Sequence, residues 1–470
     1  MSDRHESVVI NLDQALPEVF ELGIANSIVC SGSCAHADRL AKIEVNLGGA
    51  YRELTTLDRG RRNDRWVTEF FSIVDVADDK PEGRYGVRFR ITFEGGRHVE
   101  VVVANIEIVR RASRDVKIAV EPNVSTPMIA ICMATYNPER QALERQLQSI
   151  IDQTYRHWIC IVCDDGSDCE YQQLLADCCS SDSRIYLVSH PNNVNFYRNF
   201  ERALSYVPES VEYIALADQD DRWYPEKLKT LVNSFDAETL LVYSDMRIVD
   251  HNGDELLPTY WGQRRNNYER LDLLLLANTV TGAACIFRSS LLPVILPFPM
   301  RIGDAFHDHW IACVALSLGR IAYVDESLYD YYQHRSSVIG HCDFEPPTLM
   351  SRVTVWWSGI RKITSGTRVK QRLITIYNAS LAVYRFECLR LRLMTHLIAR
   401  RCPTLSTHTK QALQMYTGGV ACGLRLLAFH SKVVLKGYTT DDAELRLGMG
   451  FLVAAVDQWR YGKSIVRKRR

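Results

Sequence analysis

The chain has 470 residues, more than one ordinary hydrophobic core supports, and this length predicts roughly two to four domains. Hydrophobic residues make up 47% and aromatic residues 10%, as in folded globular proteins, and no run reaches the roughly 18 apolar residues of a transmembrane helix. Lysine and arginine total 56, as do aspartate and glutamate, and this balance argues against a protein that coats nucleic acid.

The first residues, MSDRHESVVI, are polar and lack the apolar core of a signal peptide. We therefore expect a cytoplasmic location, where the 14 cysteines stay mostly reduced. Two spacings match pairs of zinc ligands, namely Cys160-x-x-Cys163 and Cys30-x-x-x-Cys34-x-His36. Neither is joined by a second pair at zinc-ribbon spacing, so we interpret these cysteines as packed thiols.

Residues 1–115 have the pattern of a small all-β domain. At 87–93, apolar and polar residues alternate, as in a strand with one buried face. The glycines at 95–96 supply a tight hairpin turn, after which the alternation restarts. We predict a β-sandwich, followed by a charged and proline-containing linker at 116–126. Further strands are expected at 42–46 and 66–72.

The pattern then changes to that of an α/β domain, which we place at 127–345. The run MIAICMATYN is continuously apolar, as in a parallel strand that is covered on both faces. Asn137 is predicted to cap the helix that follows, with Pro138 at its first position. Strands and helices then alternate, which predicts a mostly parallel sheet flanked by helices. The remaining strands are expected at 157–163, 184–189 and 213–217. Residues 346–470 have helical spacing throughout, which predicts a helical C-terminal region.

Polar clusters follow three strands of the predicted sheet: Thr135-Tyr136-Asn137, Asp164-Asp165-Gly166-Ser167 and Asp218-Gln219-Asp220. Ligands of parallel sheets bind beyond the carboxyl ends of the strands, so these clusters should converge. Converging carboxylates repel one another unless a cation neutralises them, and their oxygens suit Mg²⁺ or Mn²⁺. The alternative for DQDD is a solvated helix start, which we accept for Asp221 and Glu226. We reject it for Asp218 and Asp220, because they close an apolar strand.

Five motifs resemble family 2 glycosyltransferases of the GT-A fold: ATYNP, DDGS, DQD with the following DRWYPEKL, HDHW and YYQHRSSVIG. The resemblance covers about residues 127–345, and the DQDD and final motifs are most similar to bacterial rhamnosyltransferases of polysaccharide assembly. It implies an inverting, metal-dependent transferase that moves a sugar, with rhamnose favoured, from a dTDP- or UDP-sugar. The implied acceptor is a glycan or a lipid-linked glycan.

The resemblance also assigns residues to the nucleotide sugar. Thr135, Tyr136 and Asp165 would contact the base and ribose, with Asp165 accepting the imide N–H of uracil or thymine. Arg198 would lie against the nucleotide, and Asp218 would face the ribose or the metal. UDP-galactofuranose, UDP-glucose and UDP-N-acetylglucosamine stay open as donors.

A divalent metal, Mg²⁺ or Mn²⁺, would hold the donor diphosphate through Asp218, Asp220 and His334. Gly282 resembles the acceptor-side turn of the family, where a glycine lets the backbone approach the sugar; an ordinary tight turn is the alternative. The dipeptide at 336–337 is Ser-Ser, where related chains often carry Asn, so this loop departs from the pattern.

The resemblance implies that Asp308, in HDHW, is the base that removes the proton from the acceptor hydroxyl. An N-terminal helix cap is the alternative role for Asp308, and Asp304 is the rival base. Trp223 and Trp310 either stack on sugars or belong to the core.

Two other functions compete with sugar transfer. One is a glycan-binding or scaffold protein with a retired catalytic domain, against which the intact acidic motifs argue. The other is a nucleotidyltransferase, which should carry a glycine-rich phosphate loop with a lysine, and MATYNPERQ has neither. The basic tail at 463–470 predicts weak peripheral contact with an anionic membrane, with a solvated end as the alternative.

Overall fold

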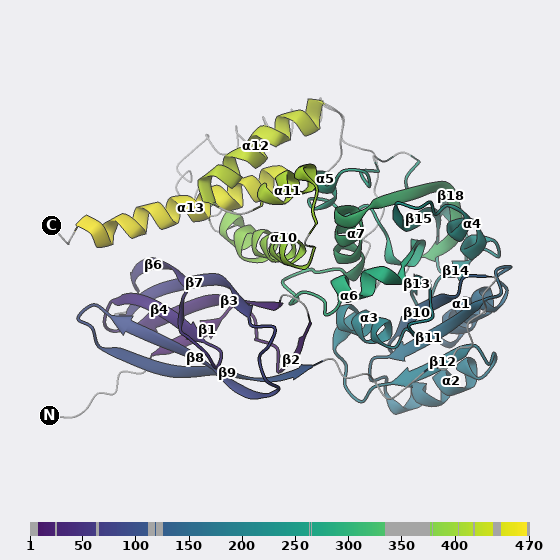
Figure 1. The fold of residues 1–470 in the computed structure, drawn as a ribbon, viewed down its shortest axis with the longest axis horizontal. Helices are drawn as coiled ribbons and strands as arrows, with labels where there is room; N and C mark the ends of the chain where they lie inside the picture. Colours follow the sequence, from purple (N-terminus) through teal and green to yellow (C-terminus); the bar gives the residue numbers. More distant parts are fainter. Residues whose placement is uncertain are drawn as a thin grey trace.

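The structure is a computed structural model that describes residues 8–467, except 24–25, 63–64, 111–117, 119–125, 263, 265, 334–376, 378, 403, 417–418 and 436–442. Three parts are evident in Figure 1: two β-sheets near the N-terminus, a central α/β domain, and a group of C-terminal helices that lies over both. The domain boundaries predicted from the sequence stay predictions, because 116–126 and 345–346 fall largely outside the described residues. In the described ranges, no helix combines the length and the apolar character needed to cross a membrane.

The N-terminal part consists of two facing sheets. One has the order β1-β3-β7-β6, and the other has the order β2-β9-β8-β4-β5. Phe70 of the first sheet and Phe89 of the second meet edge to face, with ring centroids 5.2 Å apart. The strands are β1 (Val9–Leu12), β2 (Val19–Leu22), β3 (Asn26–His36), β4 (Leu40–Asn46), β5 (Arg52–Glu53), β6 (Thr55–Arg62), β7 (Arg65–Val76), β8 (Gly83–Phe93) and β9 (His98–Arg110). The strands expected at 42–46, 66–72 and 87–93 are therefore confirmed.

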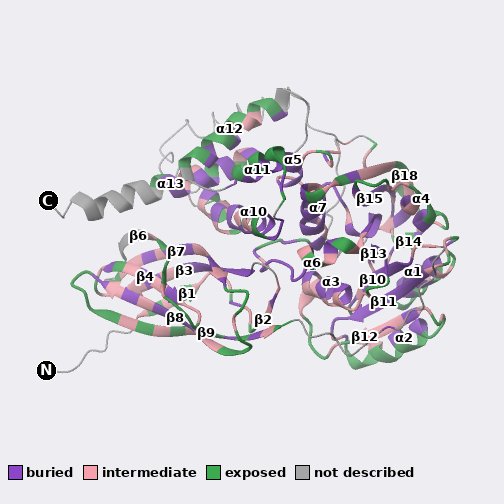
Figure 2. Cartoon of the chain, in the orientation of Figure 1, coloured by how far each residue is buried: buried purple, intermediate pink, exposed green. Residues whose placement is uncertain are grey.

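The central sheet has the order β12-β11-β10-β13-β17-β15-β18-β14, with β16 paired to β15. Its strands are β10 (Ile129–Thr135), β11 (Trp158–Asp164), β12 (Ile185–Ser189), β13 (Tyr213–Ala217), β14 (Arg222–Trp223), β15 (Thr239–Val249), β16 (Glu255–Leu257), β17 (Cys285–Arg288) and β18 (Arg320–Tyr332). Every residue of β11 and β13 is buried, and the central strands are purple in Figure 2. The continuously apolar runs thus form strands that are covered on both faces.

The sheet is mixed, which corrects the prediction of a mostly parallel one. Strands β12, β11, β10 and β13 are parallel, as expected for strands joined by helical crossovers. Strand β17 is antiparallel to both of its neighbours, β13 and β15, and β14 is antiparallel to β18. After β15 the chain enters the adjacent strand β17 from the same edge of the sheet at which β15 ends. The two strands therefore run in opposite directions.

Helices α1 (Arg140–Ile151), α2 (Cys169–Cys179) and α3 (Asn195–Ser205) connect the parallel strands. The central domain also contains α4 (Lys227–Asn233), α5 (Leu271–Leu274), α6 (Leu292–Ile295) and α7 (His307–Leu318). Asn137 does not cap α1, because the helix begins three residues later, after Glu139. Instead, Asn137 has φ 42°, and its side chain exchanges hydrogen bonds of 2.9 Å with Asp168. It therefore ties the loop after β10 to the loop after β11.

The C-terminal part contains a π-helical turn (Tyr384–Cys388), α10 (Leu389–Arg401), α11 (Thr407–Gln414), α12 (Gly419–Leu435) and α13 (Ala443–Arg467). His396 and Arg400 of α10 both contact the Asp75 carboxylate of β7, at 2.7 Å. The other side of this group packs on α7 and α5 of the central domain. These helices thus connect the N-terminal sheets to the domain that holds the predicted site.

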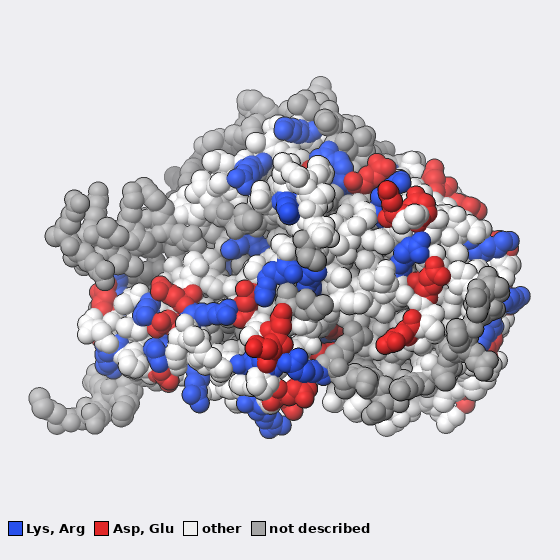
Figure 3. All heavy atoms as spheres, viewed as in Figure 1, with Lys and Arg blue, Asp and Glu red and all other residues white. Residues whose placement is uncertain are grey.

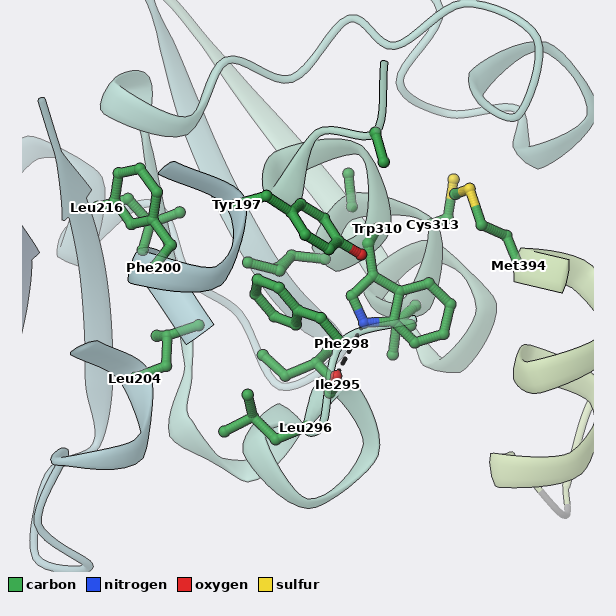
Figure 4. Packing of buried hydrophobic residues seen from close by; sticks show 14 of the residues in the cluster. Tyr197, Phe200, Leu204, Leu216, Ile295, Leu296, Phe298, Trp310, Cys313 and Met394 are labelled. Atoms are coloured by element: carbon green, nitrogen blue, oxygen red, sulfur yellow. Dashed lines mark hydrogen bonds between the residues drawn. The ribbon is translucent and has the colours of Figure 1, made fainter. Parts of the chain in front are cut away.

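Trp310 is a core residue. Its indole Nε1 donates a 2.9 Å hydrogen bond to the Ile295 carbonyl, and Tyr197, Phe298 and Met394 pack around it (Figure 4). Trp223 is also buried, with 2% of its surface exposed. Neither indole is placed to stack on a bound sugar, so the core alternative is correct for both.

Candidate active site

A cavity of about 420 Å³ opens at the carboxyl ends of β10, β11 and β13. The chain runs from β10 outward to β11 and β12, then returns to the other side of β10 as β13. Such a reversal leaves a crevice beyond the strand ends, which is where α/β sheets bind ligands. The walls are completed by α3, the start of α7 and the end of β18.

Most of the residues predicted from the sequence line this one cavity: Thr135, Tyr136, Asp165, Asp218, Asp220, Gly282 and Asp308. They come from five separate segments of the chain, which the fold brings together around the cavity. His334 lies outside the described residues, as does the Ser-Ser dipeptide at 336–337. The roles of all these residues stay predictions, because position in a cavity does not by itself assign chemistry.

The Asp218–Asp221 turn is fixed by backbone contacts. The Gln219 side chain accepts a 2.9 Å hydrogen bond from the Tyr136 backbone N–H and donates to the Tyr136 carbonyl at 3.4 Å. The Arg145 guanidinium donates to the Asp220 carbonyl at 2.6 Å and stacks on Tyr332, which also lines the cavity. The turn therefore presents its acidic side chains from a rigid backbone.

Several acidic side chains cluster at this turn. Burial raises the pKa of Asp218 to about 7, and the negative charges of Asp220 and Asp308 contribute to this rise. Asp221 is 1% exposed, and neither of its carboxylate oxygens has a hydrogen-bond partner. Burial, together with Asp220 and Asp218, holds the Asp221 pKa well above its ordinary value. The interpretation of Asp221 as a solvated residue of a helix start is thus wrong, whereas Glu226 is exposed as expected.

Lys227 is the buried cation that faces this charge. Its side chain is fully buried, its ammonium lies 3.9 Å from the ring centroid of Trp223, and it donates a hydrogen bond to the Ala283 carbonyl. Burial lowers the pKa of Lys227 to about 7, an effect that Asp221 and Asp218 oppose. One ammonium does not allow all of these acids to be ionised together near pH 7, so their full ionisation would need a further cation.

The donor set fits a divalent cation. Asp218 and Asp220 offer hard carboxylate oxygens beside an uncompensated negative charge. Among the residues that the structure describes, no group of three or more His, Cys, Asp or Glu is arranged to hold a metal. Mg²⁺ is usually bound through one or two carboxylates plus the phosphates of a substrate, so two carboxylates would be enough to hold it.

Asp165 lies at the other end of the cavity and is 2% exposed. Its Oδ1 accepts hydrogen bonds from the Val194 backbone at 2.8 Å and from the Arg202 guanidinium at 3.1 Å. Burial raises the Asp165 pKa, and these two contacts partly offset the rise. Asn199 of α3 donates to the Cys163 carbonyl at 2.7 Å and holds α3 against β11.

Arg198 does not line the cavity, which contradicts its predicted contact with a nucleotide. Its guanidinium binds the Glu201 carboxylate and donates to the carbonyls of Phe298 and Pro299, both at 3.3 Å. The side chain therefore faces the segment before α7, on the far side of α3. Arg202, one turn later, is the arginine of α3 that reaches the site through Asp165.

Asp308 lies in the first turn of α7, where three N–H donors surround its carboxylate. The Asn278 amide and the His309 backbone donate to Oδ1 at 3.1 and 2.6 Å, and the Gly282 backbone donates to Oδ2 at 3.0 Å. Burial raises the Asp308 pKa to about 6, although these donors oppose the rise. Phe306 occupies the N-cap, so the capping alternative for Asp308 is not observed. The rival Asp304 is exposed and does not line the cavity.

His307 explains the glycine at 282. The His307 ring is stacked on Phe200 with centroids 3.8 Å apart, and neither ring nitrogen has a partner. Burial lowers the His307 pKa to about 3, so the ring is neutral. A Cβ at Gly282 would lie 2.7 Å from Nε2 of this ring, a distance that real Cβ atoms essentially never show. Only glycine allows the turn to approach His307 and Asp308 this closely.

Several residues of the cavity were not predicted from the sequence: Ala134, Asn193, Asn195, Phe196, Asn199, Phe200, Gln219, Phe306, His307, Tyr331 and Tyr332. Asn195 has φ 72°, a conformation that asparagine tolerates better than most residues. The NNVN run at 192–195 could have pointed to this loop, because asparagine-rich runs indicate turns with unusual backbone angles.

Comparison with known proteins finds similarity over the central segment. Residues 130–295 match the family model described as Glycosyl transferase family 2. An uncharacterized glycosyltransferase of Methanocaldococcus jannaschii is 23% identical over 194 residues, which are 40% of this chain and 65% of that protein. The UDP-Glc:alpha-D-GlcNAc-diphosphoundecaprenol beta-1,3-glucosyltransferase WfgD of Escherichia coli is 26% identical over 174 residues, or 36% of this chain and 64% of that protein. The chain thus spans less than two thirds of the length of either relative.

Solved structures are similar at a low level. The mannosyltransferase PcManGT from Pyrobaculum calidifontis, in complex with GDP-Man and Mn²⁺, has a TM-score of 0.38 and 13% identity, over 73% of this chain and 90% of that chain. S. aureus TarS 1-349 in complex with UDP-GlcNAc has a TM-score of 0.37 and 13% identity, over 72% and 92% of the two chains. Both scores are below 0.5, so neither structure bears on the ligand of this chain.

Substitution of Gly282 by alanine should destabilise the protein. The added methyl group would collide with the His307 ring, which stacking on Phe200 holds in place. We expect the free energy of unfolding to fall by about 1–3 kcal/mol, as for other overpacked sites. Urea unfolding followed by tryptophan fluorescence measures this change. The control is Gly49→Ala, whose added Cβ would meet nothing within 4 Å; equal stability of both variants would contradict the proposed close approach.

Substitution of Lys227 by methionine should be more costly. It would remove the buried charge that offsets those of Asp218 and Asp221 and would leave the Ala283 carbonyl without its donor, and loss of a buried counter-charge typically costs about 3–5 kcal/mol. Thermal unfolding of Lys227→Met and of Lys229→Met provides a matched comparison, because Lys229 lies on the same helix with 55% of its side chain exposed. A Lys227→Met variant as stable as Lys229→Met would show that the ammonium does not stabilise the turn.

Proposed function

We propose that this protein is an inverting, metal-dependent glycosyltransferase that uses a pyrimidine nucleoside diphosphate sugar as donor. The observation that carries the proposal is the convergence of Asp218, Asp220 and Asp308 on one cavity, within a segment that matches the family 2 model. Asp218 and Asp220 would hold the metal, and Asp308 stands on a different element with a pKa suited to a base.

The reaction follows from these positions. The acceptor hydroxyl gives its proton to the Asp308 carboxylate while its oxygen attacks the anomeric carbon of the donor. The bond from that carbon to the diphosphate oxygen breaks, and the diphosphate leaves with the electron pair on the opposite face, so the configuration inverts. A divalent metal at Asp218 and Asp220 would supply charge stabilisation for the departing diphosphate. The residues of this chain would orient the donor and the acceptor, and Asp308 would hold the proton taken from the acceptor hydroxyl.

The donor base is proposed to be uracil or thymine. Asp165 is a buried acceptor in the wall of the cavity, beside the exposed ring of Tyr136, and an acceptor there suits the imide N–H of a pyrimidine. The E. coli relative is described as using UDP-Glc, which supports the same class of base. Rhamnose as the transferred sugar rests on the resemblance of the sequence motifs.

The acceptor is proposed to be a glycan or a lipid-linked glycan. The same E. coli relative is described as acting on a diphosphoundecaprenol-linked sugar, and this supports a lipid-linked acceptor for this chain. A cytoplasmic location, with action at the inner face of the membrane, belongs to the same proposal. The residues of the basic tail at 468–470 lie outside the described residues and add no structural support.

Binding of nucleotides should depend on both a metal and Asp220. Calorimetric titration with dTDP, UDP, GDP and ADP, each with and without Mn²⁺, measures this dependence. We expect dTDP or UDP to bind only with Mn²⁺, and we expect Asp220→Asn to abolish that binding, because one of two carboxylate ligands is lost.

The control for this titration is Asp304→Asn, since Asp304 is an exposed acid outside the cavity. If no nucleotide binds the native chain under any condition, the enzymatic proposal fails. The retired, glycan-binding alternative would then explain the chain better, and the N-terminal sheets would be tested on glycan arrays.

The rate of sugar transfer should depend on pH through the titration of Asp308. Its pKa is raised to about 6, and a base must be deprotonated to act, so kcat/KM should fall as the pH drops through about 6 and level off above it. Asp308→Asn should retain donor binding while kcat falls by about 10²–10⁴-fold. Product formation from a nucleotide sugar, measured from about pH 5 to 8, gives both results. An Asp308→Asn variant that keeps the native rate would remove Asp308 from the mechanism.

A further inference from the structure

Helices α10, α11 and α12 lie in a stretch of the chain that contains no acidic residue. Between Glu387 and Asp441 there are 53 residues without an Asp or Glu, although 56 acids in 470 residues would place about six there. The same stretch has eight basic residues: Arg390, Arg392, Arg400, Arg401, Lys410, Arg425, Lys432 and Lys436. The chain as a whole is neutral, so this stretch concentrates positive charge in one part of the fold. Figure 3 shows blue side chains over the upper part of the molecule, where α10–α12 lie in Figure 1.

Some of these cations are used within the protein. Arg400 contacts Asp75, and Arg401 is buried against the carbonyls of Val294 and Pro297. Arg425 and Lys432 of α12 lie on the exposed side of their helix, and the Arg425 guanidinium also donates to the Gln414 carbonyl at 3.2 Å. They are spaced seven residues apart, so they lie on the same side of α12.

The exposed side of α12 is otherwise apolar. Val420 is 49% exposed and Leu424 is 56% exposed, and Ala421 and Ala428 are exposed beside them. The opposite side of α12 packs on α13, and α12 forms the outer edge of the molecule in Figures 1 and 2. An exposed helix face of a globular protein is ordinarily polar, so this apolar stripe with flanking cations is unusual.

A basic hollow borders this stripe. It has a volume of about 370 Å³ and lies between α5, α11 and α12. Arg270, His408 and Lys432 line it, together with the ring of Phe429. Its one acid, Asp272, is bound to Arg270 at 2.5 Å. The hollow therefore offers cations beside an apolar ring, next to an apolar helix face.

We propose that the exposed face of α12, with the hollow beside it, is a docking surface for a bilayer of anionic lipids. The apolar stripe (Val420, Leu424 and Ala428) would enter the interface, while Arg425 and Lys432 would meet the lipid phosphates. Interfacial helices combine these two features, an apolar face and flanking basic residues, because neither alone holds a protein on a membrane. The absence of acids over the whole stretch favours an anionic surface over a second copy of this neutral chain.

This surface is separate from the cavity at the carboxyl ends of the strands, and the proposal does not depend on sugar transfer. It places the membrane contact on α12 rather than on the basic tail. Vesicle binding is measured without donor or metal, so its outcome and that of the proposed transferase activity are observed independently.

The test is flotation of the full chain with vesicles of phosphatidylcholine alone or of phosphatidylcholine mixed with phosphatidylglycerol. We expect binding to the anionic vesicles and at least about tenfold less to the neutral ones. The double variants Arg425→Gln/Lys432→Gln and Val420→Ser/Leu424→Ser should each lower the binding by about tenfold or more. The matched control is Arg97→Gln/Val102→Ser, which changes an arginine and a valine that are similarly exposed on the N-terminal sheets.

Three results would overturn the proposal. The first is no binding to anionic vesicles, and the second is equal binding by the α12 variants and the control. The third is a concentration-dependent dimer, seen by light scattering, that Val420→Ser/Leu424→Ser dissociates, because a second copy would then cover the stripe. Thermal unfolding of each variant verifies that the substituted surface residues leave the fold intact.

Discussion

The repulsion among clustered carboxylates at the end of β13 is the constraint on which the rest of the site depends. Asp218, Asp220 and Asp221 follow a fully buried strand within four residues, and Asp308 of α7 adds its charge from across the cavity. Each buried charge costs several kcal/mol unless it is paired, and Lys227 supplies one ammonium against them. A cation bound at this turn, as the proposed function requires, would relieve the repulsion.

The topology of the sheet creates that concentration of charge. Strand β13 returns to the side of β10 that β11 leaves open, so the ends of β10 and β13 lie next to each other. Gln219 then joins the two ends by pairing with both backbone groups of Tyr136. These contacts hold the acid turn and the loop after β10 together. Gln219, which lies between Asp218 and Asp220, therefore maintains the shape of the turn.

The sequence predicted those parts of the site that follow directly from strand ends. Thr135, Asp165 and Asp218 each come just after a continuously apolar run, and burial on both faces makes such runs unambiguous. The failures concern contacts between distant segments. Arg198 was predicted to face the nucleotide, but on a helix each residue turns by about 100°, and tertiary packing decides which side meets the cavity. Asp221 was assigned to a solvated helix start, because nothing local shows that Tyr329 and Lys227 enclose it. The sequence also failed to predict the mixed direction of the sheet. Strand β17 has four residues, and its antiparallel direction depends on its pairing with β13 and β15, which are distant in the sequence.

If Asp308 is the base, as proposed, its hydrogen bonds favour one of its two oxygens for that role. A carboxylate oxygen has two lone pairs, and Oδ1 already accepts from the Asn278 amide and the His309 backbone. Oδ2 accepts from the Gly282 backbone alone and keeps one lone pair for a proton. The same Gly282 contact fixes the turn beside which an acceptor sugar would lie under the proposed function, so that turn would also position Oδ2. Neutral His307, packed against Gly282 and unable to take a proton near pH 7, leaves Asp308 as the group of this helix turn whose charge changes in the working range. Burial raises the Asp308 pKa and the donors limit the rise, so the carboxylate stays mostly ionised at neutral pH, as the proposed role of a base requires.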